Sequence, residues 1–182
     1  RVPKPKTIMK LSIVSLLALL GFSAACTLDG CDHPDCGSCG NACCKLSITI
    51  PEDTESVMNK LNGSIVSGGP DGLYTPMMTA EGTLTFGDLR PFGKPIDFIG
   101  QAVHTTINGM YNDTVNFSLA PTADNGTEIA AFSISQIAGA YCDDGQNYWN
   151  ILQLVQGVKW EGGDLEEDQV AHVDGSCPEP SR

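Results

Sequence analysis

The sequence is poor in positive charge. Its 182 residues hold 10 Lys+Arg against 22 Asp+Glu, which gives a formal net charge of −12. Nucleic acids and anionic membrane surfaces are bound through basic faces, so the composition disfavours both partners. The sequence also lacks a nucleophile elbow, a phosphate loop, a paired-acid motif and the acidic spacing of a calcium loop. We therefore expect no catalytic residue, no bound metal and no cofactor.

The sequence has only one pronounced apolar stretch, and it is short. Residues 11–22 are apolar apart from two serines, and a membrane-spanning helix needs about 20 such residues. Met9 and Lys10 precede the stretch, and small residues lead from it to Cys26. This order predicts that residues 1–25 comprise upstream residues and a secretory signal peptide, with translation starting at Met9. No transmembrane segment would then remain in the mature chain.

Cleavage before Cys26 changes the charge balance. It removes four of the ten basic residues and leaves 157 residues with a net charge of −16. The predicted location is extracellular or the lumen of the secretory pathway. If the source is bacterial, a lipid anchor on Cys26 is an alternative that the sequence leaves open.

The eight cysteines are unevenly distributed. Because an exported protein meets an oxidising environment, their even number predicts disulfides, and residues 26–44 are expected to form a cross-linked flap. Two alternatives exist. One is a thiol-redox pair at Cys36 and Cys39, and the other is a zinc site with ligands from His33, Cys36, Cys39, Cys43 and Cys44. The disulfide candidates are Cys26, Cys31, Cys36, Cys39, Cys43, Cys44, Cys142 and Cys177.

Four Asn-x-Ser/Thr sequons follow the flap. Their acceptors are Asn62, Asn112, Asn116 and Asn125. Four sequons in a short exported chain predict N-glycosylation at the surface.

The periodicity of residues 45–160 predicts a single α+β domain. Alternation predicts strands at 46–50, 83–86, 96–107, 112–119 and 128–137, with hairpin turns at 108–109 and 124–126. Helical periodicity predicts one helix over 52–61, ended by Asn62 and Gly63, and another over 145–158. We therefore expect an antiparallel meander sheet of about five strands, with one helix before it and one after it. Residues 161–182 are expected to be an acidic tail.

The second helix and the loop before it contain the best site candidates. Asp143 or Asp144 is predicted to cap the helix, and Asn147 and Asn150 are expected to face outward from it. Loops on a rigid scaffold often carry function, so the candidate ligand-binding residues are Asp143, Asp144, Asn147 and the strand residue His104. His104 is expected at the surface of the sheet.

Five spaced segments match a family pattern. Residues 34–38, 101–104, 111–115, 132–139 and 143–147 correspond to P-N-C-V-S, Y-x-x-A, D-D-x-E, R-S-x-S-R-x-G and D-x-G-x-N. From about residue 98 to 158 the chain thus resembles domain-of-unknown-function family fourteen ninety-nine. The resemblance implies a fold and a family rather than a reaction. Phe132 and Gln136 replace the two arginines, which argues against an anion-binding role for that strand.

Together these patterns favour a secreted, non-catalytic binding or surface component. The main alternative is a small-ligand-binding protein or a hydrolase-like enzyme that uses the sheet face near His104 and the loop at 143–147. It would require a deep pocket with converging polar groups. The weaker alternative is the thiol-redox protein.

Overall fold

The computed structural model of the chain describes residues 42–79, 82–83, 85–137, 143 and 145–172. The chain divides into two units, residues 1–33 and 34–182, and all described residues belong to the second unit. The predicted signal peptide, Asp144, and every cysteine except Cys43 and Cys44 lie outside the described residues.

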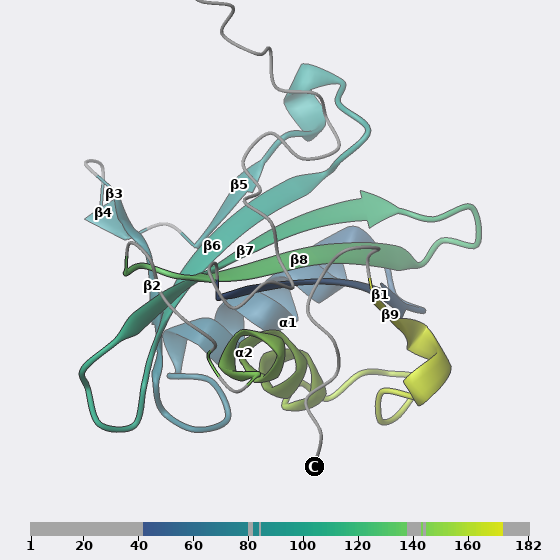
Figure 1. The fold of residues 1–182 in the computed structure, drawn as a ribbon. Helices are drawn as coiled ribbons and strands as arrows, with labels where there is room; N and C mark the ends of the chain where they lie inside the picture. The colour runs from purple at the N-terminus through teal and green to yellow at the C-terminus, as the bar shows by residue number, and fades with distance from the viewer. Residues whose placement is uncertain (1–41, 80–81, 84, 138–142, 144, 173–182) are drawn as a thin grey trace, which may run out of the picture. The chain divides into compact units, whose positions relative to one another are not determined.

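Seven strands form one antiparallel sheet (Figure 1). Its order is β2-β6-β7-β8-β1-β9, and β5 pairs with β6 on the same side as β2. The strands are β1 (Cys43–Ile50), β2 (Tyr74–Pro76), β5 (Phe86–Asp88), β6 (Phe98–Thr105), β7 (Asn112–Pro121), β8 (Thr127–Ser135) and β9 (Val170–His172). A separate two-stranded hairpin consists of β3 (Met78–Thr79) and β4 (Gly82–Thr83).

The predicted α+β class is confirmed, but the expected count of about five strands is too low. Three strands of the sheet, β2, β5 and β9, have only three residues each. Such strands are too short to display a period of two in the sequence.

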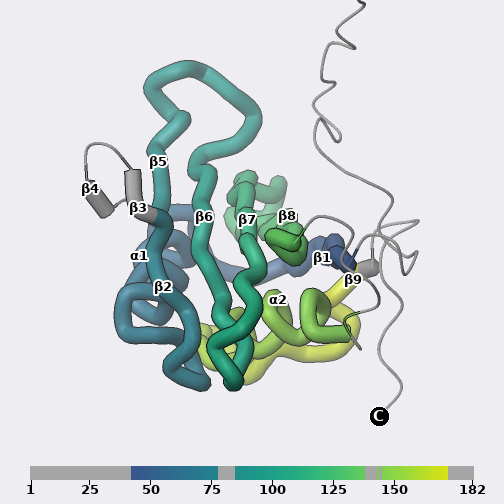
Figure 2. Tube along the Cα trace, turned by 60° about the vertical axis from the view of Figure 1, so that its left-hand side comes forward, coloured from purple at the N-terminus to yellow at the C-terminus, as the bar shows by residue number. Residues whose placement is uncertain are grey.

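Two helices cover one face of the sheet (Figures 1 and 2). They are α1 (Thr54–Val66) and α2 (Gln146–Gln156). The order of strand, helix, several strands and helix is the one that the sequence predicts. The sheet is not a simple meander, however, because β1 lies between β8 and β9. No helix in the described ranges is long and apolar enough to cross a membrane.

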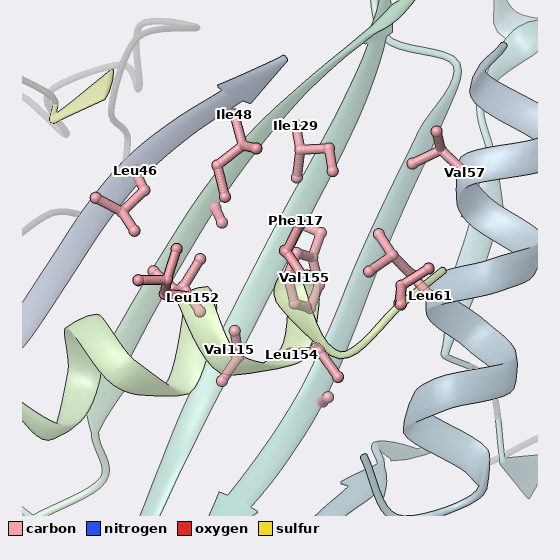
Figure 3. Packing of buried hydrophobic residues seen from close by; sticks show 14 of the residues in the cluster. Leu46, Ile48, Val57, Leu61, Val115, Phe117, Ile129, Leu152, Leu154 and Val155 are labelled. Atoms are coloured by element: carbon pink, nitrogen blue, oxygen red, sulfur yellow. The ribbon is translucent and has the colours of Figure 1, made fainter. Parts of the chain in front are cut away.

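The hydrophobic core lies between this sheet face and the helices. Alternate residues of β1, Leu46, Ile48 and Ile50, are fully buried, as the predicted period of two requires. Figure 3 shows Leu46 and Ile48 on the same side of the sheet as Leu152 and Val155 of α2, while Val57 and Leu61 of α1 contribute from the other helix. Burying such side chains stabilises the fold by about 1.5–3 kcal/mol each.

The α1 helix is longer than its sequence pattern predicts. It begins after Asp53, whose carboxylate accepts hydrogen bonds from the backbone N–H groups of Glu55 and Ser56 at 3.0 Å. Gly63 does not end it, because a mid-helix glycine costs only about 1 kcal/mol and the next turn buries Ile65 completely. The chain leaves the helix through Gly68 and Gly69, both with positive φ.

Two glycine substitutions should therefore act in opposite directions. A Cβ atom on Gly63 would meet nothing within 4 Å, so Gly63→Ala should raise the free energy of unfolding by about 0.5–1 kcal/mol. Gly69 has a φ of +69°, and its Cβ would lie 2.2 Å from the Tyr74 ring, so Gly69→Ala should lower that free energy by about 2 kcal/mol. Urea unfolding of both variants measures the difference. Equal effects would contradict the described path between α1 and β2.

Part of the expected acidic tail belongs to the sheet. A short 3-10 helix, Glu167–Gln169, leads into β9, and the Gln169 Nε2 donates to the Thr49 carbonyl oxygen at 2.9 Å. β9 then pairs with β1, with Ala171 opposite Ser47. The domain therefore extends beyond residue 160.

The first strand begins inside the segment that the sequence assigned to the flap. Cys43 and Cys44 open β1. Cys44 packs into the core on the helix-covered face, whereas Cys43 contacts Phe132 in a small separate cluster. Because neighbouring strand residues face opposite ways, the two cysteines lie on opposite faces of the sheet.

Candidate functional site

A buried network of polar side chains joins the helix-covered face of the sheet to α2. The sheet contributes His104 from β6, Asp113 from β7 and Ser133 from β8, and α2 contributes Asn147 and Asn150. Each of these five residues is at most 2% exposed. His104 and Asp113 are direct cross-strand partners, as are Val115 and Ser133, so adjacent strands bring these side chains together.

Hydrogen bonds connect the network across the sheet. The Asn150 Nδ2 donates to the Asp113 Oδ2 at 2.8 Å and to the Ser133 Oγ at 3.2 Å. The Ser133 hydroxyl donates to the Asn147 Oδ1 at 2.6 Å. The Asn147 Nδ2 then donates to the Ala42 carbonyl oxygen at 3.0 Å. The network thus links α2 to β7, β8 and the residue that precedes β1.

Asp143 holds the start of α2, although it is not the N-cap residue itself. Gly145 is the N-cap, with a φ of 82°. The Asp143 carboxylate accepts from the backbone N–H of Gly145 at 3.1 Å and of Asn147 at 2.7 Å. It also accepts from the Asn147 Nδ2 at 2.6 Å. Asp143 therefore satisfies helix N–H groups that would otherwise lack partners, in the manner of a cap.

The predicted position of His104 at the sheet surface is wrong. The residue is 2% exposed, because its strand position faces the helices. Its Nε2 lies 3.0 Å from the Asp71 Oδ2, and its ring centroid lies 4.6 Å from that of Tyr74. The His104 Nδ1 is buried and has no hydrogen-bond partner among the described groups.

Tyr74 joins His104 to the network. Its hydroxyl donates to the Asn150 carbonyl oxygen at 2.6 Å. Burial raises the pKa of the Tyr74 phenol far above its usual value, and the negative charges of Asp71 and Asp113 raise it further. Tyr74 is therefore a neutral hydrogen-bond donor at physiological pH.

The structure unites three of the four predicted ligand-binding residues, but in a closed arrangement. His104, Asp143 and Asn147 belong to the network, and Asp144 lies outside the described residues. Within the network, donors and acceptors mostly satisfy one another. The side chains from the sheet and from α2 are buried, whereas Asp143 is half-buried and the Asp71 side chain is 31% exposed. This arrangement favours attachment of α2 to the sheet over contact with a substrate.

The sequence did not reveal several members of the network. Asn147 and Asn150 were expected to face outward, yet both are buried, whereas Gln153 and Gln156 are exposed as expected. The helical periodicity of the sequence could have shown that these two residues are buried. Asn147 and Asn150 flank Tyr148 and Ile151 on the buried side, where a polar residue requires a partner. Other members that were missed are Asp71, Tyr74, Asp113 and Ser133.

The described residues contain no cluster of three or more His, Cys, Asp or Glu side chains arranged for a metal ion. Of the candidate zinc ligands, His33, Cys36 and Cys39 lie outside those residues, and Cys43 and Cys44 lie within them.

A pocket of about 400 Å³ opens beside the junction of β5, β6 and β7. Its lining includes Ile99, Gln101 and Asn116, which alternate along their strands with the buried residues Phe98, Ala102 and Val115. These three residues therefore lie on the outer face of the sheet, the face away from α1 and α2. The remaining lining residues are Met77, Thr85, Gly87, Gly100 and Phe117.

The four sequon asparagines occupy different surroundings. Asn112 and Asn125 are exposed, whereas Asn62 and Asn116 are half-buried. Asn112 and Asn116 share the outer face of β7, as the strand pattern predicts. Asn125 has a φ of 61° and forms the turn between β7 and β8.

Comparisons of the chain with protein-family models, curated proteins and solved structures find no match. The resemblance to family fourteen ninety-nine therefore stays a prediction.

Proposed function

We propose that this chain is a secreted, N-glycosylated and disulfide-stabilised extracellular domain that acts by binding rather than by catalysis. The observation that carries the non-catalytic part is the closed polar network. His104, Asp113, Ser133, Asn147 and Asn150 are the polar groups that chemistry would use, and they are buried against one another. A catalytic group must reach its substrate within hydrogen-bonding distance.

Three further features support export. The first is the sequence order that predicts a signal peptide before Cys26. The second is the even number of cysteines in the sequence, which predicts the structural disulfides that persist in oxidising compartments. The third is the exposure of Asn112 and Asn125, which leaves room for glycans.

Intact-mass analysis of the chain produced in eukaryotic secretory cells tests the proposal. We expect protein in the medium that begins at Cys26 and loses mass on enzymatic deglycosylation. Without reduction, its cysteines should resist alkylation. Retention inside the cell with an uncleaved leader, or free thiols in the secreted protein, would refute the proposal. An acyl mass on Cys26 of the chain produced in a bacterium would instead support the lipoprotein alternative.

A further inference from the structure

One sequon asparagine lies in the wall of the outer-face pocket. Asn116 is among the residues that line the pocket, and the acceptors Asn62, Asn112 and Asn125 are not. Asn116 is followed two positions later by Ser118, which lies on the same outer face of β7. The pocket wall therefore contains a complete glycosylation acceptor.

A neighbouring strand orients the amide of Asn116. Gln101 is its cross-strand partner on β6, and the Gln101 Nε2 donates to the Asn116 Oδ1 at 2.6 Å. N-linked sugars are attached to the Nδ2 atom. This atom has no hydrogen-bond partner in the part of the chain that the structure describes. Gln101 thus binds the oxygen of the acceptor amide and leaves the nitrogen available.

The pocket offers the surfaces that a sugar ring contacts. Ile99 is 46% exposed beside Gln101, and Met77 adds a second aliphatic surface. Gly87 has no side chain, so a ring can lie close to the backbone there, whereas the Phe86 ring fills the corresponding space at Gly100. A sugar has an apolar ring face together with hydroxyl groups, and a pocket of about 400 Å³ is within the size range of small-molecule sites.

We propose that the first N-acetylglucosamine of a glycan on Asn116 occupies this pocket and packs against Ile99 and Met77. The proposal rests on the export proposed above, because the sugar is added in the secretory pathway. The pocket is then filled by a modification of the chain itself rather than by a free ligand. The glycan covers an aliphatic patch on the outer face.

Native and denatured deglycosylation of the secreted protein tests the proposal. Peptide-N-glycosidase treatment in heavy-oxygen water marks each released site, and mass spectrometry of peptides then reports each site separately. After denaturation, we expect release from Asn112, Asn116 and Asn125 alike. In the native protein, release from Asn116 should be slower than from Asn112 by about tenfold or more, because the seated sugar must first leave the pocket.

A pair of variants on the same face of β6 tests whether slow release from Asn116 is due to the pocket or to general shielding by the fold. Ile99→Ser removes an aliphatic contact of the sugar and should speed native release from Asn116. Val103→Ser, on the same face but outside the pocket lining, should leave that rate unchanged. An empty Asn116 in a protein glycosylated at Asn112 and Asn125 would overturn this inference and leave the proposed export intact. So would native release from Asn116 as fast as from Asn112. A chain that is neither exported nor glycosylated would overturn both proposals.

Discussion

Replacing Asn150 by leucine is expected to lower the free energy of unfolding by about 3 kcal/mol or more. Leucine has a similar size, so little cavity or overpacking should result. The loss comes from Asp113, which is 2% exposed and accepts a 2.8 Å hydrogen bond from the Asn150 amide. Without that donor, the Asp113 carboxylate would still be buried away from water but would lose the hydrogen bond that offsets the cost of desolvation. Urea unfolding followed by tryptophan fluorescence measures the change.

Two further variants identify the cause of the loss. Gln153→Leu changes an exposed position of the same helix and should alter stability by less than about 0.5 kcal/mol. The double variant Asp113→Leu/Asn150→Leu removes both the charge and its donor, so it should be more stable than the sum of the single changes predicts. Strict additivity would contradict the role of Asn150 as the partner of a buried charge.

Replacing Glu52 by alanine is expected to cost about 3 kcal/mol. The Glu52 side chain is 2% exposed, and its carboxylate accepts hydrogen bonds from Lys60 at 2.6 Å, from Ser56 at 2.8 Å and from the Glu161 backbone N–H. It therefore connects the start of α1 to the segment after α2. Glu55→Ala is the matched control, because Glu55 pairs with Arg90 at an exposed site and should contribute little.

Glu52 should also make the free energy of unfolding depend on pH in the acidic range. Burial by itself raises the pKa of Glu52, but hydrogen bonds from Lys60, the Glu161 N–H and Ser56 outweigh burial and hold it below the ordinary value of 4.5. The unfolded chain therefore takes up this proton at a higher pH than the folded chain. The stability from Glu52 is complete above the ordinary pKa and is lost as the pH falls through the lower, folded pKa.

Unfolding measured from about pH 6 down to pH 3 tests this dependence. The wild-type chain should lose stability more steeply over this range than Glu52→Gln, which has no carboxylate at that position. Parallel curves for the two proteins would show that other groups cause the acid sensitivity.

The long elements of the fold could be predicted from the sequence because each follows one clear period. Leu46, Ile48 and Ile50 alternate, and the residues of β7 alternate between core and outer face. The tertiary structure decided the rest. α1 continues through Gly63 because Ile65 packs into the core, and β9 forms because β1 offers unpaired backbone groups.

The candidate site was only partly predictable. Sequence reasoning selected His104, Asp143 and Asn147, and the structure places all three in the network. It misplaced His104 and Asn147 at the surface, because a polar residue is exposed by default and its buried partner lies on a distant strand. The bond between Ser133 and Asn147 spans β8 and α2, and no local pattern encodes it. Such pairs become visible only when the register of the sheet is known.

The short strands at the two edges of the sheet affect the tendency of the protein to aggregate at high concentration. β9 pairs with the middle of β1, from Leu46 to Ile48, and the outer neighbour of β6 is divided between β2 and β5. Within the described part of the chain, the sheet thus ends on both sides in three-residue strands. Long, flat edges recruit strands from other molecules and begin aggregation, and very short edge strands hinder that step. The short edge strands therefore favour a protein that stays monodisperse without the help of chaperones.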